Sequence, residues 1–382
     1  MMDSSRRLSL LFFLASIVPA AFLLLSILLY GNRNETHTEG AVLELEHSSL
    51  LSIVDCEGYS VVDVANPWGE GLLQRYILVQ KTESLPSNLP EGTVVHVPVE
   101  RMLVFSGVHV SMFEELGAAG AVKAVCDAKY VYSEQTASAI ACGMVVDCGS
   151  SLDVNLEQVA MASPEVALVL PYKNGGYGKI ERVGIPLVEC ADYMEVSPLA
   201  CAEWVRFYGR LVGKGAVADS IFKSVKSEYD ALSFLAAREK KHPKLMCELK
   251  SSSAWYVPAG ESTMGRMYSD AGADYLFSSY KGTGAVSLSF ETVLEHAAEA
   301  DIWLMKYNSP VDKTYSSLLA EFGGYDSFRP YREKNIYVCN TSEKRIFEES
   351  SFHPELLLKE LVGLFHPHLF PEYKLRYYER MR

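Results

Sequence analysis

The sequence lacks an excess of positive charge. It contains 35 lysine and arginine residues and 48 aspartate and glutamate residues, which gives a formal net charge of −13. Proteins that bind nucleic acid usually carry a basic stripe that neutralises phosphates. The acidic balance therefore excludes nucleic acid as an expected partner and favours solubility.

The chain also lacks the common catalytic and metal-binding motifs. It contains no G-x-S-x-G elbow, no Walker A loop and no H-E-x-x-H helix. None of its eight cysteines forms a C-x-x-C pair, which argues against zinc ribbons and thioredoxin-like chemistry. Most of the cysteines lie in apolar, strand-like runs, as small buried hydrophobic residues do. We expect no enzyme, no resident cofactor and no metal site.

Long apolar runs are absent except for one near the N-terminus. Leu8 to Tyr30 follows Arg6 and Arg7, and its length of about 23 residues suffices for an export signal or a membrane anchor. We predict that residues 1–31 are a signal peptide or N-terminal anchor and that the rest of the chain lies outside the cytoplasmic membrane. The polar residues 32–50 are predicted to be a tether. No cysteine follows the run, so a lipid-modified cysteine is not expected.

The remaining sequence alternates between strand-like and helix-like segments. Residues 51–99 predict a β-rich N-terminal extension, and residues 100–196 alternate as a first lobe, with Val166–Leu170 as a strand buried on both faces. Helical periodicity over 197–242 predicts a connecting segment, and residues 243–372 alternate again as a second lobe. The predicted fold is α/β, with two lobes that each hold a parallel-rich sheet flanked by helices, joined by a long helical segment.

The two lobes share an internal similarity. "NLEQVAMASPEVALVLPY" in the first resembles "SFETVLEHAAEADIWLMKY" in the second. Each has an acidic residue early in a helix, another just before a strand, and a tyrosine where the strand ends. This pattern indicates two lobes of like construction, although chance similarity between two αβ units is the alternative.

Aromatic and polar residues follow many of the predicted strands. In open α/β sheets, ligands bind beyond the carboxyl ends of the strands, so these residues predict an inter-lobe cleft. Trp255 is expected in its wall, because tryptophan and tyrosine offer flat apolar area with a polar tip. The ligand-binding candidates are Ser106, His109, Tyr130, Tyr172, Tyr177, Trp255, Tyr256, Tyr280 and Tyr307.

Several phrases resemble one known family. "RMLVFSGVHVSMFEELGAAGAVKAVCD", "GIPLVECADYMEVSPLACAEWVRFYGRLVGK" and "AWYVPAGESTMGRMYSDAGADYL" occur in order, together with the two similar segments above. They are similar to substrate-binding proteins of iron-complex and cobalamin ABC importers, in the form found in Bacteroidetes-like bacteria. The resemblance implies a periplasmic monomer that captures a metal chelate (a corrinoid, a ferric siderophore or haem).

The resemblance also implies delivery of the ligand to an ABC permease and ATPase complex in the inner membrane. Family members dock through one acidic residue on each lobe. The corresponding loops offer Glu181 and Asp312, although Lys173 stands where an acid is expected.

The choice of ligand and of function stays open at this point. Haem needs an axial histidine or tyrosine, for which His109, Tyr177 and Tyr256 are candidates. An anionic siderophore favours basic residues, and the loops offer only Lys129, Lys173 and Lys281, so a corrinoid is preferred.

Two functions compete with transport. One is a two-lobe metalloenzyme of chelatase or nitrogenase-like build, for which Cys142 and Cys148 form the only close cysteine pair. The other is a non-transporting binding or sensor protein, which Lys173 would allow.

Overall fold

A computed structural model describes residues 40–84, 86 and 89–382. The predicted signal peptide or anchor at 1–31 lies outside the described residues. None of the helices within residues 40–382 combines the length and the hydropathy that crossing a bilayer requires.

The β-rich residues after position 40 form one five-stranded sheet. Its strands are β1 (Ala41–Leu43), β2 (Leu51–Asp55), β3 (Tyr59–Ala65), β4 (Leu72–Gln80) and β5 (Thr93–Val97), in that spatial order. Neighbours pair antiparallel except β4 and β5, which are parallel. Ile53, Val62 and Tyr76 are fully buried and tie this sheet to the main core.

The first lobe contains a five-stranded, fully parallel sheet. In spatial order its strands are β12 (Leu187–Glu189), β11 (Val166–Val169), β6 (Met102–Val104), β7 (Val122–Val125) and β8 (Val146–Asp147). Its helices are α2 (Gly107–Glu115), α3 (Glu134–Ala141) and α4 (Leu156–Ala162). All four residues of β11 are buried and the strand is paired on both sides, as the uninterrupted apolar run predicts.

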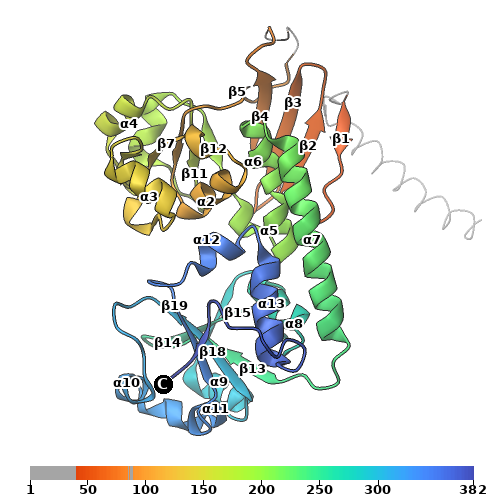
Figure 1. Ribbon diagram of the computed structural model, residues 1–382, viewed down its shortest axis with the longest axis vertical. Helices are drawn as coiled ribbons and strands as arrows, with labels where there is room; N and C mark the ends of the chain where they lie inside the picture. Colours follow the sequence, from red (N-terminus) through yellow and green to blue (C-terminus); the bar gives the residue numbers. More distant parts are fainter. Residues whose placement is uncertain (1–39, 85, 87–88) are drawn as a thin grey trace, which may run out of the picture. The chain divides into compact units, whose positions relative to one another are not determined.

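A helical segment connects the lobes. It comprises α5 (Pro198–Glu203), α6 (Val205–Leu211) and α7 (Gly215–Ala237). Ser197 caps α5 by accepting a hydrogen bond from the Ala200 amide, and Gly213, at φ +68°, allows the chain to turn between α6 and α7. In Figure 1 the long α7 runs beside both lobes, and it packs against α6 and α13 (Pro354–Phe365).

The second lobe contains two sheets. The larger is ordered β16 (Asp274–Tyr275), β13 (Lys244–Cys247), β18 (Ile302–Tyr307), β19 (Ile336–Asn340) and β20 (Glu379–Arg380), and it is parallel except for β20. The smaller is antiparallel: β14 (Lys250–Ser251), β15 (Ala254–Pro258) and β17 (Ala285–Leu288). The other helices are α8 (Thr263–Asp270), α9 (Phe290–Ala297), α10 (Tyr315–Glu321), α11 (Arg329–Arg332) and α12 (Ile346–Ser350).

Residues 40–50 differ from the predicted tether. Besides forming β1, this segment donates backbone hydrogen bonds to two buried carboxylates: the amides of residues 46–48 to Glu203, and those of residues 49 and 50 to Glu195. The hydroxyls of Ser48 and Ser49 also donate to Glu195. The polar composition of the segment conceals this role, because most of the anchoring groups are main-chain N–H groups.

The chain after residue 372 is also part of the fold. Buried Glu360 of α13 accepts hydrogen bonds from the backbone amides of Arg376, Tyr377 and Tyr378, which lie between 2.6 and 2.8 Å away. The side chains of Tyr377 and Tyr378 are almost fully buried, and β20 completes the edge of the sheet. The boundary predicted at 372 therefore omits ordered chain.

Candidate functional site

Two adjoining cavities lie at the carboxyl ends of the parallel strands. One, of about 320 Å³, is bordered by residues of both lobes: Phe105, Ser106, Gly107, Val108, Cys126, Asp127, Tyr130, Tyr132, Ser151 and Leu170 of the first, and Asn308, Thr341, Phe347 and Glu348 of the second. The other, of about 370 Å³, is lined by Ser106, Val108, His109, Leu170, Pro171, Tyr172, Asp192, Tyr193 and Ser351. We call the two together the inter-lobe cleft. Volumes of this size are typical of small-molecule sites.

Local features of the sequence shape the cleft floor. Ser106 caps α2 by accepting a hydrogen bond from the Val108 amide, which starts the helix directly after β6. A Cβ atom on Gly107 would lie 2.6 Å from the Tyr130 carbonyl oxygen, so glycine is needed for that loop to approach the helix. β11 ends where Leu170 and Pro171 enter the cleft lining, which accounts for its abrupt stop.

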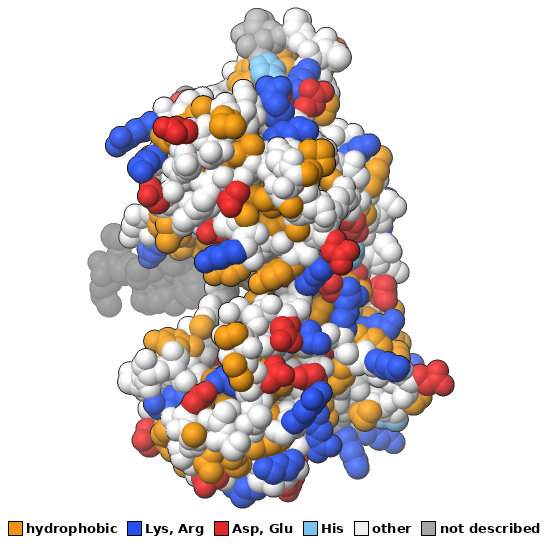
Figure 2. Space-filling model, turned by 60° about the vertical axis from the view of Figure 1, so that its left-hand side comes forward, with side chains coloured by type: hydrophobic (Ala, Val, Ile, Leu, Met, Phe, Trp, Pro, Cys, Tyr) orange, Lys and Arg blue, Asp and Glu red, His pale blue; other side chains and the backbone are white. Residues whose placement is uncertain are grey.

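The second lobe contacts the first through α12 and the residues after it. Helix α12 packs against α2. Phe352 lies with its ring centroid 5.9 Å from that of His109 and 5.8 Å from that of Tyr208. Figure 2 shows hydrophobic side chains on both sides of the notch between the two lobes. The cleft therefore offers apolar surface from both lobes.

The charged groups that line the cleft are mostly acidic. Among the residues that the structure describes, those lining the two cavities include Asp127, Asp192 and Glu348 but no lysine or arginine. Burial raises the pKa of Glu348. Burial, reinforced by the charge of Glu348, also raises the pKa of the Tyr132 phenol on the facing lobe. The cleft is thus suited to neutral or cationic ligands rather than to anions.

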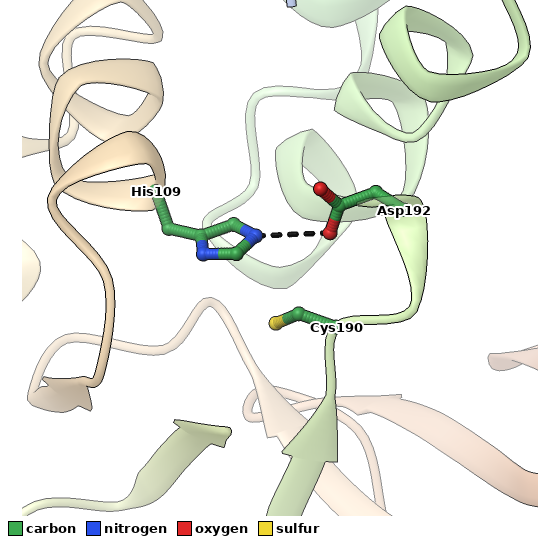
Figure 3. A group of neighbouring side chains, drawn as sticks. All are labelled: His109, Cys190 and Asp192. Carbon is green, nitrogen blue, oxygen red and sulfur yellow. Dashed lines mark hydrogen bonds and ion pairs between the residues drawn. The ribbon is translucent and has the colours of Figure 1, made fainter. Parts of the chain in front are cut away.

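His109, Cys190 and Asp192 form a buried cluster at the edge of this cleft (Figure 3). Asp192 Oδ1 lies 3.0 Å from His109 Nε2 and accepts a hydrogen bond of 2.5 Å from the Tyr208 hydroxyl. Burial alone lowers the pKa of His109, but the charge interactions with Cys190 and Asp192 outweigh it and raise that pKa well above its usual value. Within the described residues no other group of three or more histidine, cysteine or acidic side chains has metal-ligand spacing.

The structure brings together four of the nine predicted ligand-binding residues. Ser106, His109, Tyr130 and Tyr172 line the cleft. Both tyrosines are about half exposed, at 49% and 51%.

The other five candidates do not line these cavities. Tyr177 packs against the smaller core cluster of the first lobe. Tyr256 is 51% exposed on β15. Tyr280 packs beside Phe277 and His296.

The last of the five is Tyr307, which is buried at the end of β18 and donates a hydrogen bond to Asp312.

Trp255 is the clearest correction. The prediction placed it in the cleft wall because residues 250–254 read as a polar loop after a strand. Those residues instead form β14 and a turn into β15, which places Trp255 inside a sheet. Its side chain is fully buried against Trp303, Tyr325 and Phe328.

Several cleft residues were not predicted. Asn308 and Thr341 directly follow β18 and β19, so the rule that singled out Tyr172 also applies to them. Phe347 and Glu348 lie on α12, a five-residue helix too short to give a periodic signal.

The two cysteines considered as ligands of a metal cluster differ in burial: Cys142 is exposed, whereas Cys148 is buried.

A histidine joins the two lobes beside the cleft. His353, at the start of α13, lies 2.6 Å from Glu115 of α2 through Nε2 and 2.8 Å from Glu355 through Nδ1. Burial lowers its pKa, but the hydrogen bonds to the two carboxylates outweigh burial and raise the pKa to about 10.

We expect this contact to make stability depend on pH. Because the folded pKa of His353 is above its ordinary value of 6.5, the stabilisation is complete below pH 6.5 and is lost as the pH rises through about 10. The difference in unfolding free energy between the wild type and His353→Gln, measured by urea denaturation, should shrink across that window. A constant difference from pH 6 to pH 10 would contradict this assignment.

Comparison with known proteins identifies the architecture. Residues 107–342 match the family model described as periplasmic binding protein. An uncharacterized lipoprotein of Methanocaldococcus jannaschii is 25% identical over 321 residues, which cover 80% of this chain and 75% of the relative. A second uncharacterized protein of that organism is 20% identical over 232 residues, 60% of this chain and 68% of its own length.

Solved structures share the fold at low identity. A possible iron-binding (periplasmic solute-binding) protein from Staphylococcus epidermidis superposes with a TM-score of 0.55 at 15% identity, covering 70% of this chain and 99% of that one. An ABC-type Fe3+-hydroxamate transport system from Saccharomonospora viridis gives 0.54 at 18% identity, with 70% and 94% covered. The periplasmic heme binding protein HutB of Vibrio cholerae gives 0.52 at 15% identity, with 68% and 99% covered.

Proposed function

The chain belongs to the periplasmic binding protein family, and from that premise we propose that it is the extracytoplasmic substrate-binding component of an ABC importer. The observation that carries the proposal is the inter-lobe cleft, which lies at the carboxyl ends of the parallel strands and is lined from both lobes. The named relatives of this fold include iron-, hydroxamate- and haem-related binding proteins. A metal chelate is accordingly the proposed class of ligand.

Among chelates, we favour a neutral or cationic one, and a corrinoid in particular. The lining combines partly exposed aromatic rings with carboxylates. Within the described residues it contains no lysine or arginine, and its one histidine, His109, lies against Asp192. Of the three lysines considered for an anionic siderophore, Lys281 is paired with Glu261 at 3.1 Å. Lys129, which lies over the Tyr130 ring at 4.7 Å, and Lys173 are not among the lining residues. An anionic siderophore would face the carboxyl groups of Asp127 and Glu348.

Haem is the second candidate, and the arrangement of its expected axial ligands argues against it. His109 is only 2% exposed, too little for its ring to reach the iron of a bulky macrocycle, and neither Tyr177 nor Tyr256 lines the cleft. Of the tyrosines that do, Tyr193 has its pKa raised by burial and by the charge of Asp192. A raised pKa disfavours the phenolate form that binds ferric iron.

The proposal predicts that aromatic truncation on either lobe weakens binding. Tyr130→Ala and Phe347→Ala should each reduce the affinity for a corrinoid about tenfold or more, since losing one buried aromatic contact costs about 1.4 kcal/mol or more. Isothermal titration calorimetry with cyanocobalamin, haemin and a ferric hydroxamate measures the effect and ranks the ligand classes.

Tyr256→Ala is the matched control. Tyr256 is as exposed as Tyr130, at 51% against 49%, but lies outside the cleft lining, so its removal should leave the affinity unchanged. If neither Tyr130→Ala nor Phe347→Ala changes the affinity of a ligand that binds the wild type, the cleft is not the binding site. Tighter binding of the ferric hydroxamate than of cyanocobalamin would reject the corrinoid assignment but keep the binding function.

We further propose that Glu181 and Asp312 dock the loaded protein on its permease. Both side chains are exposed. Glu181 accepts a hydrogen bond from the Tyr177 amide and Asp312 one from the Tyr307 hydroxyl, so each carboxylate is held in place by its own lobe. A fixed acidic group on each lobe is suited to pairing with arginines on a membrane partner.

A further inference from the structure

We propose that His109, Cys190 and Asp192 form a binding site for one divalent zinc ion at the edge of the inter-lobe cleft. The three ligand atoms lie within 4.8 Å of one another. This inference concerns a free metal ion bound by the protein itself, and it stands whether or not the cleft takes a metal chelate.

The donor set matches the chemistry of zinc. One imidazole nitrogen, one thiolate sulfur and one carboxylate oxygen are ligands that Zn2+ takes in proteins, and mixed nitrogen and sulfur donors select it against magnesium and calcium. A thiolate and a carboxylate together neutralise the two charges of the ion, which a buried site requires. Tetrahedral coordination at about 2.0–2.3 Å places ligand atoms roughly 3–4 Å apart, so the 3.0 Å between His109 Nε2 and Asp192 Oδ1 is already close to that spacing.

The fold holds the three residues in place from two directions. His109 lies in the first turns of α2, immediately after β6, while Cys190 and Asp192 lie in the connection that leaves β12. The Cys190 amide donates to the Val169 carbonyl oxygen at 2.8 Å, which fixes the start of that connection. Figure 3 shows the Cys190 sulfur directed toward the space between the imidazole and the carboxylate.

The surroundings provide both outer support and access. The Tyr208 hydroxyl donates to Asp192 at 2.5 Å, and such second partners orient a metal-binding carboxylate. The three ligand residues are at most 4% exposed, yet His109 and Asp192 line the second cavity of the cleft. Three protein ligands leave one tetrahedral position for water or for a donor atom of a bound molecule.

Cobalt substitution tests the site directly. The metal-free, fully reduced full chain should bind one Co2+ with a thiolate-to-cobalt charge-transfer band in the near ultraviolet and with the intense visible bands of tetrahedral cobalt. Zn2+ should displace the cobalt and abolish both signals. Cys190→Ser should lose the charge-transfer band, and His109→Ala and Asp192→Asn should lose the stoichiometric visible bands.

Cys142→Ser is the control for binding at an exposed thiol, and it should retain every signal. Circular dichroism and a cooperative melt of each variant establish that it is folded, and Asp192→Asn is nearly isosteric if Cys190→Ser fails that check. The proposal is overturned if the reduced wild type shows no charge-transfer band at one equivalent of Co2+. It is equally overturned if the band persists in Cys190→Ser or disappears in Cys142→Ser.

Discussion

Replacing Glu203 with alanine is expected to lower the free energy of unfolding by about 3–5 kcal/mol, the range for removing one partner from a buried charged network. Glu203 is fully buried. Its carboxylate accepts the backbone amides of Glu46, His47 and Ser48 at 2.8–2.9 Å and lies 3.4 Å from Arg206. Without it, three backbone amides lose their acceptor, while the Arg206 guanidinium keeps Asp219 and the Glu44 carbonyl oxygen.

The loss should spread to the N-terminal sheet, because residues 46–48 lead into β2. Urea denaturation monitored by circular dichroism measures the free energy. The matched control is Glu228→Ala: Glu228 is a half-exposed residue of α7 whose ion pair with Lys359 spans 3.8 Å, so its removal should cost no more than about 1 kcal/mol. Equal stabilities of Glu203→Ala and Glu228→Ala would show that the segment is not held by this carboxylate.

Truncating Trp255 to alanine is expected to cost about 3–5 kcal/mol of stability, the usual range for removing a large aromatic from a core. The side chain is fully buried, its indole N–H donates to the Cys247 carbonyl oxygen at 3.0 Å, and its ring packs on Trp303 at a centroid distance of 5.6 Å. The variant leaves both a cavity and an unpaired carbonyl group.

Ligand affinity should hardly change in Trp255→Ala, because the indole lies outside the cleft lining. Tyr256→Ala is again the natural comparison. It is the next residue on β15, its side chain points to the opposite face, and it should cost less than about 1 kcal/mol. A tenfold loss of affinity with an unchanged melting temperature would restore Trp255 to the cleft wall.

The sequence by itself determined the fold class and many of the strands and helices. Uninterrupted apolar runs such as Val166–Leu170 predict buried parallel strands, and the structure has β11 there. Alternation over residues 243–372 predicts helices there, and α13 (Pro354–Phe365) begins with proline, a common first-turn residue. These signals are local: an apolar period of 3.6, a strand without polar residues, or a proline at the first turn can be read from neighbouring residues alone. The two-lobe α/β class followed from these signals, whereas the family was indicated by the resemblance of longer phrases to known proteins.

Only the tertiary structure decided which residues meet. His109 and Asp192 are separated by 83 positions, and they approach because β6 and β12 lie in one sheet with only β11 between them. Trp255 faces the core because a short hairpin, β14 and β15, precedes and contains it. The polar residues before Trp255 resemble a loop, so the sequence does not reveal this hairpin.

The same holds for the carboxylates of Glu195, Glu203 and Glu360. Each accepts hydrogen bonds from two or three backbone amides, which every residue except proline carries, so these contacts leave no pattern of side chains in the sequence. Strand and helix formation depends on near neighbours in the chain. The cleft, the His109 cluster and the buried carboxylates depend instead on the order of strands in the sheets and on main-chain geometry, which only the folded molecule establishes.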